Sequence, residues 1–316
     1  MISVIVPTYR RPDYLTEACA SVAQQTFRDF EVLVCDNAAA DDTASLIEGM
    51  NDRRFVYIPR PENLGMVANV YDGLRRARGE LVMKLDDDDV LEPDFLQTLS
   101  APMIADAAIT VSVSDFSLID SQGRPLPELK SELARMTGRT HTPANYVRPF
   151  TAFAARGSFN MVASLLRASA LDWTTISEEA ATAYDLHLLL TLAQDAAPAY
   201  YTPRELMRYR QHSESDSRTR PARQASGALF ALEHALASGR HADVEMLRLS
   251  IRNTAISLCR SLLREGKVTE ARTAMTRAGL TGIDVEALRL WALTRTPARL
   301  AHRVAVVRSR RSAARY

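Results

Sequence analysis

Residues 80–90 read ELVMKLDDDDV, an apolar run followed by four consecutive aspartates. A short apolar run bounded by polar residues is typical of a buried strand in a parallel sheet. Four adjacent carboxylates at the end of such a strand repel one another unless a cation or strong hydrogen-bond donors compensate them. In open α/β sheets, ligands lie at the carboxyl ends of the strands. The stretch therefore predicts an acidic ligand site at one edge of a parallel sheet.

A divalent cation is the natural compensation for residues 86–89. Hard cations such as Mg²⁺ or Mn²⁺ take oxygen ligands and share them with substrate phosphates. The alternatives are a solvated acidic turn, or a cluster that caps a helix opened by Pro93. Spacing alone leaves these interpretations open.

Up to about residue 120, short β-branched runs alternate with segments of helical periodicity. This alternation indicates a parallel sheet with crossover helices, the doubly wound α/β class. The expected strands are Ile2–Val6, Glu31–Cys35, Phe55–Ile58 and Leu81–Leu85. The expected helices are Pro12–Gln24, Asp42–Met50 and Gly65–Ala77, with Asp41 or Asp42 as N-cap of the second.

The chain changes character twice after this half. Between about 106 and 215 we expect an acceptor half with strands at Ile109–Ser114, Tyr200–Thr202 and Leu206–Arg210, and a helix near Asp185–Ala193. Beyond about 221 the pattern is helical, with a hairpin over 258–278 around Gly266. The predicted domains are 1–217 (nucleotide-binding half 1–105, acceptor half 106–217) and a helical C-terminal region, 218–316.

Composition excludes several classes of protein. With 47% hydrophobic and 24% charged residues, the chain is globular rather than disordered or collagen-like. Its three cysteines are too few and too far apart for a disulfide framework or a zinc cluster, and they fit a reducing compartment. No apolar run approaches the roughly 18 residues of a membrane span, and the start lacks a signal peptide. We therefore expect a cytoplasmic location.

The C-terminal residues form a basic tail. Residues 287–316 contain eight arginines and no Asp or Glu, which leaves the rest of the chain at about −7 although the net charge is +1. A helix with Leu300, Val304 and Val307 on one face would be amphipathic and suited to peripheral contact with the inner face of the membrane. The alternative is a solvated end that packs on the acidic body. Nucleic-acid binding is not expected, because aromatic residues other than Tyr316 are missing from the tail.

Several short motifs occur in a characteristic order. They are SVIVPTYR (3–10), SV with QTF (21–27), FEVLVCDN (30–37), NLG with Asn69 and Gly73 (63–73), ARGE (77–80) and the aspartate run. This order resembles the family 2 glycosyltransferases, closely over residues 2–100 and more loosely to about 217. The resemblance implies a GT-A (Rossmann-like) nucleotide-diphosphosugar transferase domain with a C-terminal helical appendix. It also implies inverting transfer of a sugar from a nucleotide diphosphate to a hydroxyl acceptor, with Mn²⁺ or Mg²⁺.

The resemblance also assigns donor-site residues. Those that match its nucleotide-binding positions are Pro7, Thr8, Tyr9, Arg10, Asp36, Asn37 and Asn69. Many family members have a second Asp where this chain has Asn37, so the base stays open between uracil, thymine and another, and a UDP-sugar is the expected donor. Asp86 and Asp88 occupy the fixed positions of the family's D-x-D motif. Asp88 is the expected metal ligand, with Asp86 or Asp87 near the ribose.

A second motif lies at the end of the predicted catalytic domain. Family members commonly have an arginine followed two residues later by a histidine, as in Arg210 and His212, and that histidine can complete the metal or pyrophosphate site. Arg208 and Arg210 either pair with the diphosphate or lie on a solvated strand edge.

Inverting transfer needs a general base for the acceptor hydroxyl. The family places it in a Glu-Asp pair before a helix, and strict register puts that position on Ala183. Asp185 matches the second acid of the motif, and it is also a candidate helix N-cap. Either Asp185 or the nearby Glu178 or Glu179 serves as base, or the site binds nucleotide-sugar without turnover. We expect an active enzyme with Asp185 as base.

The expected role is in bacterial cell-surface polysaccharide or glycolipid biosynthesis, with a glycan or lipid-linked acceptor. The alternative is a noncatalytic nucleotide-sugar-binding or scaffold protein. A dinucleotide-dependent dehydrogenase is excluded, because it needs glycines in the first strand–helix turn and the first glycine of this chain is Gly49. The sequence makes no prediction of the donor sugar or the oligomeric state.

Overall fold

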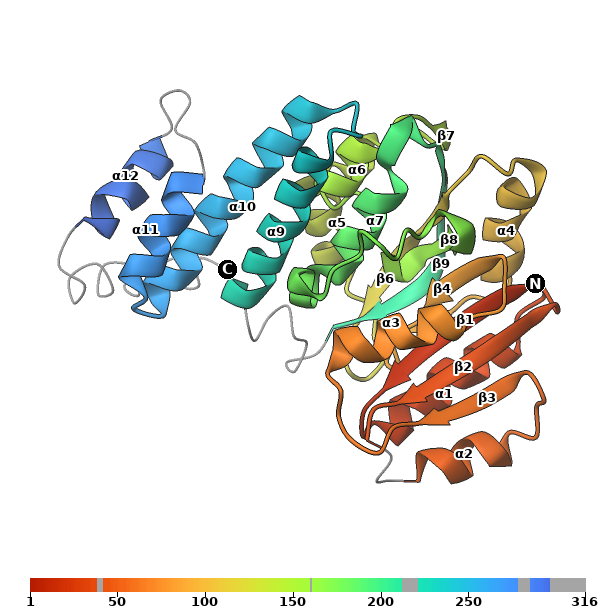
Figure 1. The fold of residues 1–316 in the computed structure, drawn as a ribbon. Coiled ribbons are helices and arrows are strands. Elements are labelled where there is room, and N and C mark those ends of the chain that lie inside the picture. Colours follow the sequence, from red (N-terminus) through yellow and green to blue (C-terminus); the bar gives the residue numbers. More distant parts are fainter. Residues whose placement is uncertain (39–41, 160, 212–220, 278–284, 296–316) are drawn as a thin grey trace.

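A mixed β-sheet lies at the centre of the protein (Figure 1). The computed structural model describes residues 1–38, 42–159, 161–211, 221–277 and 285–295. In these residues the sheet has nine strands: β1 Ile2–Thr8, β2 Phe30–Asp36, β3 Phe55–Pro59, β4 Leu81–Lys84, β5 Val90–Leu91, β6 Val111–Ile119, β7 Asn145–Val147, β8 Ser164–Arg167 and β9 Ala199–Arg210. Their spatial order is β3-β2-β1-β4-β8-β6-β9-β5, and β7 also pairs with β9.

The first four strands are parallel, as the alternating pattern predicts. The register places Ile5 beside Lys84, and Thr8 beside Asp36. The carboxyl ends of β1, β2 and β4 therefore lie together at one edge of the sheet. Beyond β4 the pairing becomes mixed, because β8 runs antiparallel to both β4 and β6. The predicted doubly wound α/β half is confirmed, with strand boundaries that differ by one or two residues.

Helices cover both faces of the sheet. On one face, α1 (Pro12–Ala23), α2 (Thr43–Gly49) and α4 (Phe95–Ala105) bury Leu15, Ile47 and Phe95 against the strands. On the other face lie α3 (Met66–Arg76), α6 (Thr151–Ala155) and α7 (Tyr184–Leu192). Burial of an apolar stripe from each helix is the main favourable contribution to this packing.

Some predicted elements of the acceptor half are wrong. The strands expected at Tyr200–Thr202 and Leu206–Arg210 are parts of one strand, β9. The pairing of β9 with β6 shifts register between Thr202 and Glu205, and Pro203 lies in this irregular stretch. A bulge accommodates a proline, which lacks the N–H needed for a regular ladder, so the strand continues through it. The polar stretch before it also contains an unpredicted helix, α5 (Pro127–Met136).

The predicted helical character of the C-terminal region is confirmed. Its helices are α9 (Pro221–Ser238), α10 (Val244–Arg264), α11 (Val268–Arg277) and α12 (Val285–Thr294). Gly266 turns the chain between α10 and α11, as the hairpin pattern predicts. The core on the α3–α7 face continues without a break into α9, α10 and α11. The domain boundary at 217 stays a prediction, because residues 212–220 are outside the described part.

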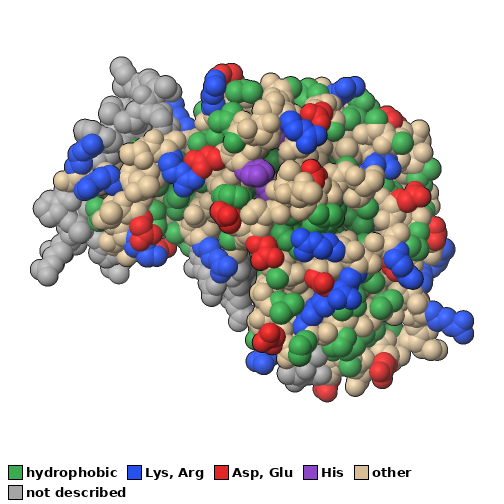
Figure 2. All heavy atoms as spheres, viewed as in Figure 1, with side chains coloured by type: hydrophobic (Ala, Val, Ile, Leu, Met, Phe, Trp, Pro, Cys, Tyr) green, Lys and Arg blue, Asp and Glu red, His purple; other side chains and the backbone are tan. Residues whose placement is uncertain are grey.

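On the face drawn in Figure 2, acidic and basic side chains lie interspersed among hydrophobic ones. None of the helices in the described ranges combines the length and the apolar character that a membrane span requires. The basic tail, residues 297–316 with Leu300, Val304 and Val307, lies outside those ranges, so its contact with a membrane stays a prediction.

Candidate functional site

The loop after β1 meets the aspartates after β4 at the edge of the sheet. Thr8 Oγ1 donates a 2.8 Å hydrogen bond to Asp87 Oδ2, while Thr8 also lies beside Asp36 in the strand register. Tyr9 is exposed, and the Arg10 guanidinium lies 5.2 Å from the centroid of its ring. Three predicted donor-site segments are thus brought together, with the aromatic ring of Tyr9 open to a ligand.

Asp36 and Asn37 are buried at the end of β2 and organise the neighbouring loop. Asp36 accepts a 2.7 Å hydrogen bond from the hydroxyl of Tyr57. The amide nitrogen of Asn37 donates to Asn63 Oδ1, and its oxygen accepts from the backbone N–H of Leu64, both at 2.8 Å. Asn37 therefore holds the loop that opens α3. Reading of the base by this pair stays a prediction.

The Asn69 amide is bonded inside the protein. Its side chain on α3 is 1% exposed, and both ends of the amide are engaged inside the protein. Nδ2 donates to the carbonyl of Cys35 at 2.8 Å, and Oδ1 accepts from Arg60 Nε at 3.4 Å. The amide nitrogen has a second N–H and the oxygen a second lone pair, so contact of Asn69 with the donor stays a prediction. Asn69 joins the ends of β2 and β3.

The aspartate run is surrounded by basic groups that the sequence analysis did not select. Lys84, buried in β4, pairs with Asp86. Arg11, which directly precedes α1, lies 3.2 Å from a carboxylate oxygen of Asp88 and 3.7 Å from one of Asp87. A lysine inside an apolar strand is a detectable signal, because buried charges require partners. Arg11 carries no comparable signal beyond its position after the first loop.

The carboxylates of the run are only partly compensated. Burial, followed by the charge of Asp88, raises the pKa of Asp87 to about 7, although the Thr8 hydroxyl and Arg11 act in the opposite direction. Burial also raises the pKa of Asp89 well above its usual value, with the charges of Asp86 and Asp88 adding to the effect. Carboxylate oxygens whose negative charge is not fully neutralised by neighbouring cations are the ligands that a hard divalent cation prefers. On this observation the run fits Mg²⁺ or Mn²⁺.

The described residues do not complete a metal site by themselves. Within them, no three Asp, Glu, His or Cys side chains are grouped so as to hold a metal ion. His212, the predicted further ligand, lies outside the described ranges. Hard cations commonly complete their coordination with substrate phosphates and water, so a carboxylate pair is a sufficient protein contribution.

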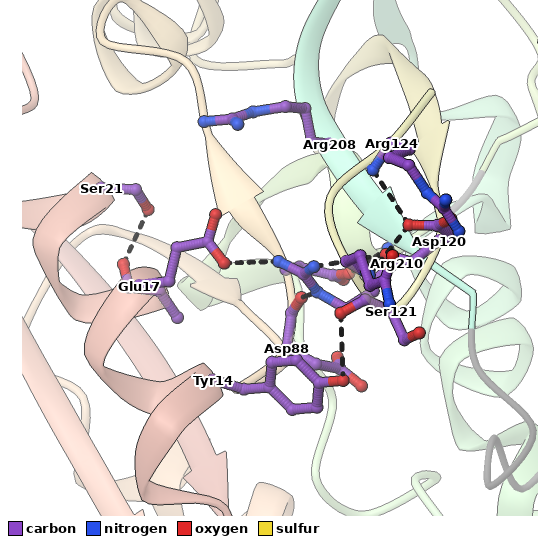
Figure 3. A network of polar contacts seen from close by, with 12 residues as sticks. Tyr14, Glu17, Ser21, Asp88, Asp120, Ser121, Arg124, Arg208 and Arg210 are labelled. Atoms are coloured by element: carbon purple, nitrogen blue, oxygen red, sulfur yellow. Dashed lines mark hydrogen bonds and ion pairs between the residues drawn. The ribbon is translucent and has the colours of Figure 1, made fainter. Parts of the chain in front are cut away.

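Arg210 is buried and connects the aspartate run to the turn after β6 and to α1 (Figure 3). Its Nε donates to the carbonyl of Asp88 at 2.7 Å, and Nη1 donates to the carbonyl of Asp120 at 3.3 Å. Nη2 pairs with the Glu17 carboxylate on α1, and the guanidinium lies 4.9 Å from the ring centroid of Tyr14.

The solvated strand edge predicted for Arg210 is wrong, because its side chain is buried and bonded within the protein, while its pairing with a diphosphate stays a prediction. Its backbone N–H also donates to Asp89 Oδ1 at 2.8 Å. Arg208, by contrast, is half-exposed and pairs with Glu92 at 3.3 Å. Arg210 holds the backbone of the run, whereas Arg208 lies inside the sheet, between Val90 of β5 and Ser117 of β6.

Asp185 lies in the first turn of α7, near the aspartate run. The helix begins at Tyr184, with Ala183 at the N-cap position, so Asp185 is not the N-cap. The Lys84 ammonium lies 5.9 Å from the ring centroid of Tyr184. Burial raises the pKa of Asp185, the charge of Lys84 lowers it and the charge of Asp86 raises it. Asp185 and the run thus share one electrostatic environment.

The two other candidate bases lie in a different setting. Glu178 and Glu179 are exposed at the start of the 3₁₀ turn η4 (Glu178–Ala183). A general base near neutral pH benefits from a raised pKa, which burial supplies to Asp185. Among these three acids, the environment favours Asp185 for that role.

A parallel half that gathers Thr8, Asp36 and an aspartate run at its strand ends, joined to a mixed half that contributes Asp185, defines the GT-A class of nucleotide-diphosphosugar transferases. Residues 3–161, about half of the chain, match the model of Glycosyl transferase family 2. The chain belongs to that family, and the predicted GT-A fold with a helical C-terminal region is confirmed.

Individual relatives resemble part of the chain. The GalNAc(5)-diNAcBac-PP-undecaprenol beta-1,3-glucosyltransferase of Campylobacter jejuni is 39% identical over 101 residues, which are 31% of this chain and 33% of that protein. The match therefore spans about a third of the relative's length.

Two solved structures show the same fold over nearly the whole chain. S. aureus TarS 1–349 in complex with UDP-GlcNAc has a TM-score of 0.68 at 15% identity, covering 96% of this chain and 88% of that one. The mannosyltransferase PcManGT of Pyrobaculum calidifontis, in complex with GDP-Man and Mn²⁺, has a TM-score of 0.61 at 17% identity, covering 96% and 84%.

Proposed function

We propose that this chain is an inverting glycosyltransferase that moves a hexose-type sugar from a nucleotide diphosphate to a hydroxyl acceptor. The observation that carries the proposal is the nearness of Asp185 to the aspartate run, through Lys84 and Tyr184. A donor-phosphate site and a carboxylate of raised pKa in one environment are the two parts that inverting transfer requires.

The proposed reaction is a single displacement. The acceptor oxygen attacks the anomeric carbon and passes its proton to the Asp185 carboxylate. The bond between that carbon and the diphosphate oxygen breaks, and the nucleoside diphosphate leaves with the electron pair. A bound Mn²⁺ or Mg²⁺ would supply charge neutralisation for the departing diphosphate.

The chain's own residues would prepare this step. Asp88 is the proposed metal ligand, with His212 as a further one. The carboxylate of Asp86 or Asp87 would face the ribose, and Thr8 orients Asp87. The exposed ring of Tyr9 offers a stacking surface for the base, with Arg10 beside it.

The proposed donor is a UDP-sugar, and the proposed acceptor is a glycan or a lipid-linked glycan on a pathway to a bacterial surface polysaccharide or glycolipid. TarS is a structural neighbour seen with UDP-GlcNAc, and the named C. jejuni relative carries a polyprenol-linked acceptor in its name. Both support these classes. We further propose a cytoplasmic site of action, with membrane contact through residues 297–316.

The experiment is a donor-turnover assay with a panel of UDP-, GDP- and dTDP-sugars, with Mn²⁺ or Mg²⁺ and with EDTA. Release of nucleoside diphosphate to water reports chemistry without a known acceptor. We expect turnover of one donor class that EDTA abolishes. Tight donor binding with no turnover, either in water or with added cell extract as a source of acceptors, would instead support the noncatalytic nucleotide-sugar-binding or scaffold alternative.

A further inference from the structure

Helix α9 of the C-terminal region packs along the segment that carries Asp185. Gly227, Phe230 and His234 are spaced by three and four residues, so they lie on one face of α9. Gly227 contacts the turn η4, before Asp185. The rings of Phe230 and His234 lie 5.9 and 5.1 Å from that of His187, which follows it. One helix face therefore touches the chain on both sides of Asp185.

Gly227 allows an unusually close approach. A Cβ at this position would lie 2.0 Å from the carbonyl oxygen of Ala180 and 2.9 Å from its carbonyl carbon. No side chain fits there unless α9 and η4 move apart. Glycine inside a helix costs about 1 kcal/mol relative to alanine, so the close backbone contact is what this residue contributes.

The turn that Gly227 contacts is strained. Ala181 has φ 47° and ψ −126°, a combination that residues with a side chain rarely adopt. Such a residue costs on the order of 1–3 kcal/mol and persists only where its surroundings hold it. Ala180 and Ala183, which lie in the same turn, are fully buried. Both lie against Gly227 of α9. The packing of α9 therefore sets the direction in which the chain enters α7.

The second contact holds the other end of this segment. The backbone N–H of Ser177 donates to His187 Nε2 at 3.1 Å, which ties the start of η4 to the first turns of α7. Burial, followed by the charge of His234, lowers the pKa of His187 to about 4, so the ring is neutral. With its proton on Nδ1 the ring accepts the Ser177 bond at Nε2, and with its proton on Nε2 it donates to the carbonyl of Thr175 at 3.2 Å, so either tautomer bonds to this segment. A hydrogen bond thus joins the two ends of the segment from Ser177 to His187, and α9 packs against that segment.

We propose that Gly227 is a positioning residue for Asp185, so that the helical C-terminal region is a working part of the transfer site. The inference rests on the proposed function, in which Asp185 takes the acceptor proton. An added methyl group at Gly227 would displace η4 and, with it, the first turn of α7. A shift of about 1 Å at a reacting group can cost about 10²-fold in rate.

The test compares Gly227→Ala with Gly49→Ala. Gly49 also lies in a helix, and a Cβ there would meet nothing within 4 Å, so it controls for glycine replacement. For Gly227→Ala we expect kcat of donor turnover to fall about 10-fold or more, with KM for the donor and calorimetric affinity for UDP and Mn²⁺ unchanged. His234→Ala, a half-exposed side chain on the same face, should lower kcat in the same sense if Gly227→Ala fails to fold.

A second measurement is independent of activity. Hydrogen exchange of residues 177–192 should accelerate in Gly227→Ala and His234→Ala, while the strands β1 and β4 keep their protection. A folded Gly227→Ala protein with wild-type kcat and wild-type exchange overturns the proposal, as does a parallel loss of UDP affinity and kcat. If the wild type turns over no donor, the proposed function fails, and exchange alone then decides whether α9 orders this segment.

Discussion

The hydroxyl of Thr8 donates a 2.8 Å hydrogen bond to the carboxylate of Asp87, 79 residues further along the chain. The contact joins the loop after β1 to the aspartate run after β4. It exists because β1 and β4 are parallel neighbours whose carboxyl ends reach the same edge. The Thr8 hydroxyl also lowers the pKa of the buried Asp87, which burial raises.

Replacing Thr8 with valine should destabilise the protein. Valine keeps the shape but leaves the Asp87 carboxylate without this donor, and an unsatisfied buried polar group costs about 1–3 kcal/mol. Denaturant unfolding at pH 7 measures the difference. Thr8→Ser should restore most of the loss, and Thr16→Val, at an exposed threonine on α1, should change stability by less than about 0.5 kcal/mol. Equal stability of Thr8→Val and wild type would contradict a structural role for the bond.

Replacing Asp88 with asparagine should weaken metal-dependent nucleotide binding. The side chain keeps nearly the same shape but loses the charge that a divalent cation requires. Calorimetry with UDP should show at least about a 10-fold loss of affinity in Mn²⁺ and little change in EDTA. Asp94→Asn is the matched control, since Asp94 is an exposed carboxylate paired with Arg204. Equal Mn²⁺-dependent affinity in wild type and Asp88→Asn would show that Asp88 is not a ligand.

Replacing Asp185 with asparagine should separate binding from chemistry. UDP affinity should stay near that of the wild type, while donor turnover falls about 10²-fold or more, the usual scale for loss of a general base. Glu178→Gln and Glu179→Gln serve as controls, because both acids are exposed. A folded Asp185→Asn protein with full turnover, together with loss in one of the glutamate variants, would move the base to that glutamate.

Replacing Arg210 with lysine should destabilise the protein despite the retained charge. Lysine has no planar fork to reach the carbonyls of Asp88 and Asp120 while pairing with Glu17. Loss of buried charged hydrogen bonds should lower the free energy of unfolding by about 2–4 kcal/mol. Arg208→Lys, at a half-exposed ion pair with Glu92, should change it by less than about 1 kcal/mol. Similar effects at the two positions would argue against the connecting role of Arg210.

The buried His187 should make the protein sensitive to mild acid. Its pKa is lowered from 6.5 to about 4 in the folded protein, so the unfolded chain binds the proton more readily. Its contribution is complete above pH 6.5 and is lost as the pH falls toward 4, by up to about 3 kcal/mol. In His187→Gln this part of the pH dependence should disappear from the unfolding curves. His141→Gln, at an exposed histidine, should keep the wild-type slope.

Patterns local in sequence predicted the parallel half and the acidic edge. Hydrophobic periodicity is set by which face of each element is buried, so the strands and helices of residues 2–85 were recognisable within one or two residues at most boundaries, whereas β5 and α4 were not predicted. The motif order, from the loop at residues 3–10 to the aspartate run, likewise indicated the family. These features depend on neighbours along the chain, which a sequence displays directly.

Residue roles that depend on distant partners were not predictable. Asn69 has the residue type of a ligand contact, yet the fold turns its amide toward Cys35 and Arg60. Arg210 occupies a motif position, but only the tertiary structure shows that its side chain is buried and bonds to α1 and to the aspartate run.

The sequence by itself determined the class of fold, the family and the position of the acidic site, because each follows from local periodicity and motif spacing. Tertiary structure alone decided which of the candidate acids shares the electrostatic environment of that site, and which helix packs against it. Asp185 comes under the charge of Asp86 only because the fold brings the start of α7 to Lys84 at the end of β4. Gly227 meets Ala180 only because α9 packs against η4. Such contacts join residues dozens of positions apart, and their energies depend on burial that a sequence does not display.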